Sequence, residues 1–227
     1  MNRLMRFTLS TCMAVAAAHV AVFPAMALAG DDDHDARRYA VTITNLTRSQ
    51  VLTPPVVIVH NRTFTLFTPG DPARPELARL AEDGMTQPLV DLLATEHGVY
   101  QTQVGGAIPP GESTTVEIEV SGRFRFLTAA GMLASTNDGF YSIHDVKVPE
   151  TGGTEVDADA YDAGSENNSE SCAFIPGPPC GHPGVRDTLG AEGFVHIHSG
   201  IHGVADLVPA THDWRNPVAQ VTIERIR

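Results

Sequence analysis

Two short acidic turns carry the residues of this chain that are best suited to binding a metal ion. In residues 161–168 (YDAGSENN), Asp162 and Glu166 stand four apart with a glycine between them, and residues 135–140 (STNDGF) present Asp138. Hard cations such as Ca²⁺ take six to eight oxygen ligands, and turns rich in Asp, Asn, Ser and Gly supply such oxygens densely. The same residue types also form ordinary surface turns, and no EF-hand spacing is present, so the pattern leaves both interpretations open.

A histidine-rich stretch, residues 194–203 (FVHIHSGIHG), offers a second candidate metal site. On a strand, His196 and His198 would point to the same face, and His202 would return after the Ser-Gly turn. Three imidazoles of this kind can bind Zn²⁺ or Cu²⁺ through their ring nitrogens. The alternative is a row of hydrogen-bonding histidines on a polar face, because the spacing identifies no fourth ligand.

Beyond the N-terminal region the chain has two cysteines, Cys172 and Cys180, in the proline-rich segment CAFIPGPPC. In an oxidising compartment this pair predicts a disulfide that closes a short loop. Loop-closure entropy gives such a bond roughly 2–3 kcal/mol of stabilisation. A thiolate metal site is the alternative, and it is disfavoured because thiols oxidise in that compartment.

The N-terminal region has the features of a signal peptide, residues 1–29. Two arginines, Arg3 and Arg6, precede an apolar alanine-rich run, and small residues allow cleavage after Ala27 or Ala29. The apolar run is short for a membrane span, so no transmembrane anchor is expected. The sequence therefore predicts a secreted or periplasmic protein, with an acidic disordered tail at residues 30–37 and one domain at residues 38–227.

The charge of the chain favours cations as partners. It has 15 Lys+Arg against 27 Asp+Glu, a formal net charge of −12, and Lys147 is its one lysine. Cleavage of the signal peptide would remove two arginines and no acid, which gives −14. Such a chain is not expected to bind nucleic acid or anionic lipid through its charge.

Alternating apolar and polar residues predict many short strands. We expect them at residues 39–46, 56–60, 63–67, 99–104, 114–120, 123–129, 139–148, 194–198 and 218–226, with short helices at 75–81 and 88–94. Residues 150–192 hold seven acidic residues up to Glu170 and then the cysteine segment, so we expect a long ordered loop or a disordered insert. The predicted fold class is all-β: an antiparallel β-sandwich with a small helical insertion and a long acidic, disulfide-closed loop.

Three segments, residues 132–140 (MLASTNDGF), 161–166 (YDAGSE) and 213–217 (DWRNP), resemble the spondin N-terminal domain family. The resemblance covers most of residues 38–227 and implies an antiparallel β-sandwich that holds one Ca²⁺ in loops at one end. It places the calcium ligands at Asp138, Asp162 and Glu166. The chain has Asn137 and Gly139 where the animal pattern has Pro and Trp, and Glu166 where that pattern has Asp.

Motifs of common enzyme classes are absent from the sequence, which has no Gly-x-Ser-x-Gly elbow, no glycine-rich phosphate loop and no His-Glu-x-x-His. We therefore expect a non-enzymatic, secreted calcium-binding module for an extracellular protein or glycan partner at a matrix or cell surface. The alternative is a periplasmic enzyme or metal-binding protein that uses Zn²⁺ or Cu²⁺ at His196, His198 and His202.

Overall fold

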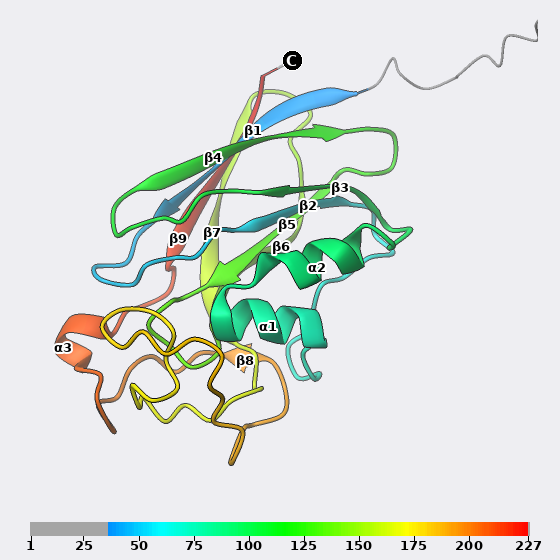
Figure 1. Ribbon diagram of the computed structural model, residues 1–227. Helices are drawn as coiled ribbons and strands as arrows, with labels where there is room; N and C mark the ends of the chain where they lie inside the picture. The colour runs from blue at the N-terminus through cyan, green and yellow to red at the C-terminus, as the bar shows by residue number, and fades with distance from the viewer. Residues whose placement is uncertain (1–35, 227) are drawn as a thin grey trace, which may run out of the picture. The chain divides into compact units, whose positions relative to one another are not determined.

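The chain folds around one antiparallel sheet with the strand order β3-β2-β5-β6-β7-β9-β1-β4 and with β8 paired to β7 (Figure 1). The computed structural model describes residues 36–226. The strands are β1 Arg37–Asn45, β2 Val56–His60, β3 Val99–Val104, β4 Ser113–Val120, β5 Phe126–Met132, β6 Gly139–Lys147, β7 Gly153–Asp162, β8 His196–Ile197 and β9 Ala219–Arg225. The helices are α1 Pro75–Asp83, α2 Thr86–Leu93 and α3 Pro209–His212.

The expected signal peptide and nearly all of the expected acidic tail lie outside the described residues. Arg37, which the sequence assigns to the tail, already belongs to β1 and pairs with Val120 of β4. Within residues 36–226 none of the helices is long and apolar enough to cross a bilayer.

The sheet curls into a nearly closed, barrel-like form, and β7 is the strand that makes this possible. Residues 153–158 of β7 pair with β9, whereas residues 159–162 pair with β6. The strands at the two ends of the path, β3 and β4, meet through the side chain of Gln101, whose Oε1 accepts a hydrogen bond from Glu119 N at 2.7 Å. The mostly-β, antiparallel character predicted from the sequence is confirmed.

Strand β2 is buried along its whole length because both of its faces are covered. Val57 and Val59 belong to the core inside the curled sheet, whereas Val56 and Ile58 belong to a second core beneath the helices. The helices contribute Leu77, Leu80, Ala81, Leu89 and Leu93 to that second core. Both predicted helices are confirmed.

The chain between β2 and α1 corrects a sequence-based expectation, because residues 63–67 form no strand. Asn61 Oδ1 accepts hydrogen bonds from Thr63 N at 2.8 Å and Thr63 Oγ1 at 2.7 Å, which turns the backbone away from the sheet. Phe64 and Phe67 are nonetheless buried in the core beneath the helices. Their apolar pattern reflects burial of a loop and not strand pairing.

Residues 150–192 also differ from the expectation, because they begin with β7, which has ten residues. In this strand Glu155 and Asp157 are exposed, whereas Ala158 and Ala160 are fully buried. These two acidic residues therefore lie on the outer face of a paired strand. The segment beyond β7 does form a long loop, and the predicted disulfide between Cys172 and Cys180 is confirmed.

The loops between β7 and β9 gather at the end of the sheet where β7 ends (Figure 1). They include β8 and α3. The expected strand at residues 194–198 is reduced to the two residues of β8, and that expected at 123–129 begins later, as β5.

Candidate metal centre

Asp162 is the last residue of β7 and occupies the centre of the candidate site. It pairs with Gly139 of β6 on one side and with His196 of β8 on the other. Its side chain is fully buried. Asp162 Oδ1 accepts a hydrogen bond from Gly164 N at 2.7 Å, and Oδ2 accepts one from Asn168 Nδ2 at 2.5 Å.

Asp138 lies in the turn that leads into β6 and is also fully buried. Thr136 Oγ1 closes this turn, because it donates to Leu133 O at 2.7 Å and accepts from Gly139 N at 2.9 Å. Asp138 Oδ2 accepts hydrogen bonds from Ser165 N at 2.7 Å and Glu166 N at 2.9 Å. Asp138 Oδ1 is buried and has no hydrogen-bond partner.

Burial makes the ionised form of this carboxylate pair unfavourable. Desolvation, reinforced by the charge of Asp162, raises the pKa of Asp138 to about 8. Desolvation also raises the pKa of Asp162, although hydrogen bonds from Asn168 and Gly164 oppose this effect. No arginine or lysine among residues 36–226 forms an ion pair with either carboxylate. Asp138 and Asp162 therefore have no compensating arginine or lysine side chain.

Glu170 shows how a buried carboxylate of this protein is satisfied when its role is structural. Its oxygens accept backbone hydrogen bonds from His202 N at 2.5 Å, Gly203 N at 2.6 Å and Val204 N at 2.9 Å. These bonds tie the loop after β7 to the turn at residues 202–204. The unpaired oxygen of Asp138 stands in contrast to this arrangement.

Glu166, the third predicted calcium ligand, is buried next to Asp138 but is paired with an arginine. Its Oε1 lies 3.2 Å from Arg186 Nε, and its Oε2 accepts a hydrogen bond from Asp187 N at 3.3 Å. Burial raises the pKa of Glu166 to about 7 in spite of these contacts. Arg186 also binds Glu82 and Asp83 at the end of α1, so one guanidinium connects the acidic loop to that helix.

Close contact between the loop after β7 and the loop before β8 brings further residues that could bind a metal ion next to Asp162. Gly164 has a φ of +65°, and a Cβ at this position would lie 2.3 Å from Phe194 O. Gly193 N donates to Gly164 O at 2.8 Å. Only glycine permits this approach, which places Glu192 and His196 beside the end of β7.

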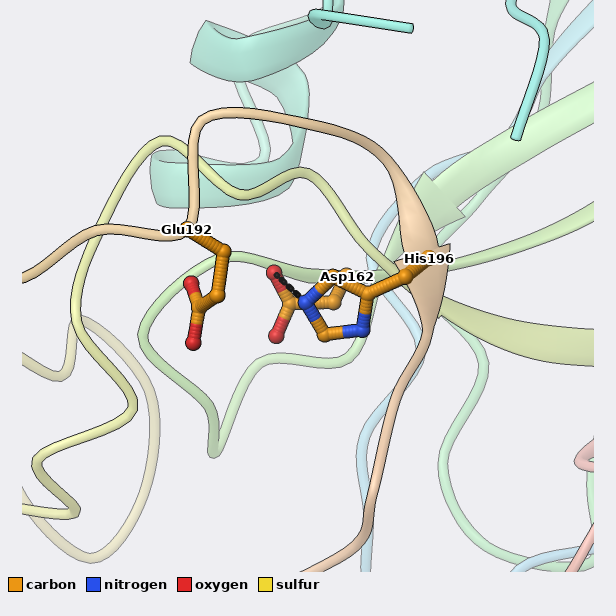
Figure 2. A group of neighbouring side chains, drawn as sticks. All are labelled: Asp162, Glu192 and His196. Atoms are coloured by element: carbon orange, nitrogen blue, oxygen red, sulfur yellow. Dashed lines mark ion pairs between the residues drawn. The ribbon is translucent and has the colours of Figure 1, made fainter. Parts of the chain in front are cut away.

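Asp162, Glu192 and His196 form a group that could hold a metal ion, with one ligand atom from each residue within 4.8 Å of the others. Figure 2 shows the Glu192 side chain and the His196 ring on either side of the Asp162 carboxylate. Asn168 Nδ2 donates to Asp162 Oδ2 and lies 3.3 Å from Glu192 Oε1, so it bridges the two acids. Glu192 was not identified from the sequence, because no local pattern distinguishes it from other surface acids.

The three histidines have different surroundings. His196 Nε2 lies 3.6 Å from Asp162 Oδ1. His198 and His202 instead line an open pocket of about 430 Å³ together with Trp214. Burial lowers the pKa of His198 to about 3, so this ring is neutral. The histidine that joins a metal-capable group is His196, and its neighbours there are acids and not the other two histidines.

No protein-family model matches the chain, and no curated protein matches it.

Proposed function

We propose that this chain is a secreted, calcium-binding β-module whose cation is held by Asp138 and Asp162. The observation that carries the proposal is the buried Oδ1 of Asp138, which has no hydrogen-bond partner and lies in the same acidic site as the buried Asp162. A buried polar group without a partner costs on the order of 1–3 kcal/mol, and more when it is charged. A divalent cation would remove this cost, because it favours the ionised carboxylates and supplies the missing partner.

Two of the three predicted calcium ligands are available to a calcium ion, whereas the third, Glu166, is paired with an arginine. Asp138 and Asp162 offer carboxylate oxygens, the ligands that calcium prefers. Glu166 is held by Arg186, so it can serve as a calcium ligand only after it gives up that ion pair. Calcium, when bound, neutralises the charge of the carboxylates. The residues of the chain connect the turn before β6 to the loop after β7.

The disulfide supports a location outside the reducing cytoplasm, since such bonds persist in oxidising compartments. We accordingly propose secretion or export to the periplasm, after removal of the expected signal peptide. We also propose that the chain is related to the spondin N-terminal domain family and that its sheet is the β-sandwich of that family. In that description β7 belongs to both sheets, one with β9, β1 and β4 and the other with β6, β5, β2 and β3. The proposed role is to bind an extracellular protein or glycan without catalysis.

Equilibrium dialysis against Ca²⁺ followed by elemental analysis tests the cation site. We expect about one calcium ion per chain, as for a single site of oxygen ligands. Asp138→Asn and Asp162→Asn should each lose most of this binding, whereas Asp157→Asn, an exposed position on β7, should keep it. Absence of calcium from the wild-type protein, or equal loss in all three variants, would refute the proposed site.

A further inference from the structure

The ring of His196 is oriented as a metal ligand. Its Nδ1 lies 2.9 Å from Ile197 O. A carbonyl oxygen can only accept, so Nδ1 carries the proton and the neutral ring has its lone pair on Nε2. His196 Nε2 is buried, has no hydrogen-bond partner and lies 3.6 Å from Asp162 Oδ1. A hydrogen bond from the distal ring nitrogen to a backbone carbonyl is the usual way in which proteins orient a ligating histidine.

The neighbouring histidines are not prepared in this way. His198 Nδ1 accepts a hydrogen bond from Gly200 N at 3.0 Å, so its proton is on Nε2 and that nitrogen has no lone pair to offer. His202 is exposed, and its Nε2 lies 3.2 Å from Ser199 Oγ. The local hydrogen bonds therefore single out one imidazole of the three.

The acids beside His196 are arranged to complete a coordination set. Asn168 holds the carboxylates of Asp162 and Glu192 next to each other, and residues that hydrogen-bond to ligands in this way orient them in many metal sites. Ligand atoms on a tetrahedral zinc at about 2.1 Å are roughly 3.4 Å apart. The ligand atoms of the three residues now lie within 4.8 Å of one another. His196 Nε2 and Asp162 Oδ1 are already 3.6 Å apart, so a change in the exposed Glu192 side chain alone can bring the three atoms to these distances.

The geometry points to a site for a borderline divalent ion of the zinc class, held by Asp162, Glu192 and His196. An imidazole with two carboxylates suits such an ion better than calcium, which prefers oxygen ligands throughout. Asp138, whose charge acts on Asp162, also has a buried oxygen, Oδ1, without a hydrogen-bond partner. Three protein ligands would fill three of the four positions of a tetrahedral zinc ion, and the exposed Glu192 gives the site access from solvent.

This inference goes beyond the proposed function, because Glu192 and His196 are not among the proposed calcium ligands. The two sites share Asp162, so zinc and calcium are expected to compete. Variants at residues that only one site uses can separate the two proposals: His196 and Glu192 for zinc, Asp138 for calcium.

The test measures Zn²⁺ and Ca²⁺ separately, on the mature folded protein, by equilibrium dialysis with elemental analysis. We expect about one zinc ion per chain. His196→Ala or Glu192→Gln should weaken zinc binding at least tenfold, since even the loss of a residue that only hydrogen-bonds to a ligand costs about 10–100-fold. His202→Ala removes an exposed histidine of the same loop and should leave the zinc affinity unchanged. Cobalt(II) absorption spectra of the same variants report the coordination geometry, and we expect His196→Ala to change them and His202→Ala to leave them unchanged.

Each outcome decides one proposal. Wild-type protein that binds no zinc, or His196→Ala with wild-type zinc affinity, overturns this inference and leaves the calcium result untouched. Equal loss of zinc in His202→Ala and His196→Ala also overturns it, because the metal would then be held elsewhere. Asp138→Asn should lose calcium and retain zinc. A wild-type protein that binds zinc but no calcium would support this inference and refute the proposed function.

Discussion

Asp162 and His196 are direct partners in the short ladder between β7 and β8, and Asp162 Oδ1 lies 3.6 Å from His196 Nε2. The two residues are far apart in the sequence, and Gly139 of β6 pairs with Asp162 on its other side. Asp162 therefore sits where the turn before β6, the end of β7 and the β8 loop meet. This position allows one buried carboxylate to contribute to both proposed ion sites.

Gly164→Ala should separate the loop after β7 from the loop before β8. A Cβ at residue 164 would collide with the backbone of Phe194, and the φ of +65° is unfavourable for alanine. We expect a loss of stability of about 1–3 kcal/mol, the usual cost of a strained backbone position, together with loss of metal binding. Thermal melting and calcium dialysis measure the two effects.

Gly193→Ala is the matched control for this variant. Residue 193 also has a positive φ, +82°, but no atom lies within 4 Å of an added Cβ. It should cost stability through strain while metal binding persists. If Gly164→Ala bound metal as the wild type does, the contact with Phe194 would not be what assembles the site.

The metal-free protein should lose stability as the pH rises through 7 to 8. Burial raises the pKa of Asp138 to about 8 and that of Glu166 to about 7, far above their values in an unfolded chain. The native state thus retains protons that the unfolded state has already released, so the stability that these two groups contribute is present below their unfolded pKa values and is lost as the pH rises through their native values. Between about pH 7 and 8.5, where His198 is mainly neutral in both states, the melting temperature in chelator should decrease.

Two further melts test the origin of this pH dependence. Calcium favours the ionised carboxylates and should reduce the decrease, and Asp138→Asn should flatten it because one titrating group is removed. A melting temperature that rises over the same pH range in chelator would contradict the assignment.

Much of the fold was predictable because local pattern and tertiary environment agree. Pro75 at the start of α1 and Gly84 after its end mark the helix, and Gly84 N donates to Leu80 O at 2.9 Å with the residue at a φ of +68°. The strand β7 was missed because its inward residues Ala158 and Ala160 are small and its outward residues are acidic. That composition resembles a solvated loop, although the alternation of period two is present.

The candidate site was predictable only in part, for a different physical reason. Asp138 and Asp162 stand out through their turn sequences, and both are buried at the same end of the sheet. Glu192 reaches Asp162 only through the contact of Gly164 with Phe194, and Arg186 reaches Glu166 from a separate loop. Such long-range packing leaves no periodic or local signal in the sequence.

Arg186→Gln should destabilise the metal-free protein and strengthen calcium binding. The substitution leaves the buried Glu166 carboxylate without its ion pair, which should cost about 1–3 kcal/mol. It also frees that carboxylate and removes a positive charge that repels the cation. Calcium titration by calorimetry should then give a lower Kd than in the wild type.

Arg215→Gln serves as the control for that titration, since the Arg215 side chain is 84% exposed. It should leave the calcium affinity unchanged. If the affinity of Arg186→Gln were equal to that of the wild type or weaker, Glu166 would not be a calcium ligand.

Reduction of the disulfide should lower both stability and calcium affinity. Loop closure by Cys172–Cys180 contributes roughly 2–3 kcal/mol. The closed loop also packs on the turn that carries Asp138, because Gly177 N donates to Ala134 O at 2.9 Å and Ser135 Oγ donates to Pro178 O. Melting and calcium dialysis with and without reductant measure these effects, and a double Cys→Ser variant should be insensitive to reductant. A reduced protein that melts as the oxidised one does would rule out this role.

The melting temperature of the mature protein in calcium and in chelator tests the central claim most directly. At free calcium a hundredfold above its Kd, binding to the folded state alone stabilises it by about 2.7 kcal/mol. For a domain of this size that corresponds to a rise of roughly 5–10 °C. Asp162→Asn should lose most of the rise, whereas the exposed Asp157→Asn should keep it. A wild-type melting temperature that is the same in millimolar calcium and in chelator would contradict a calcium site at Asp138 and Asp162.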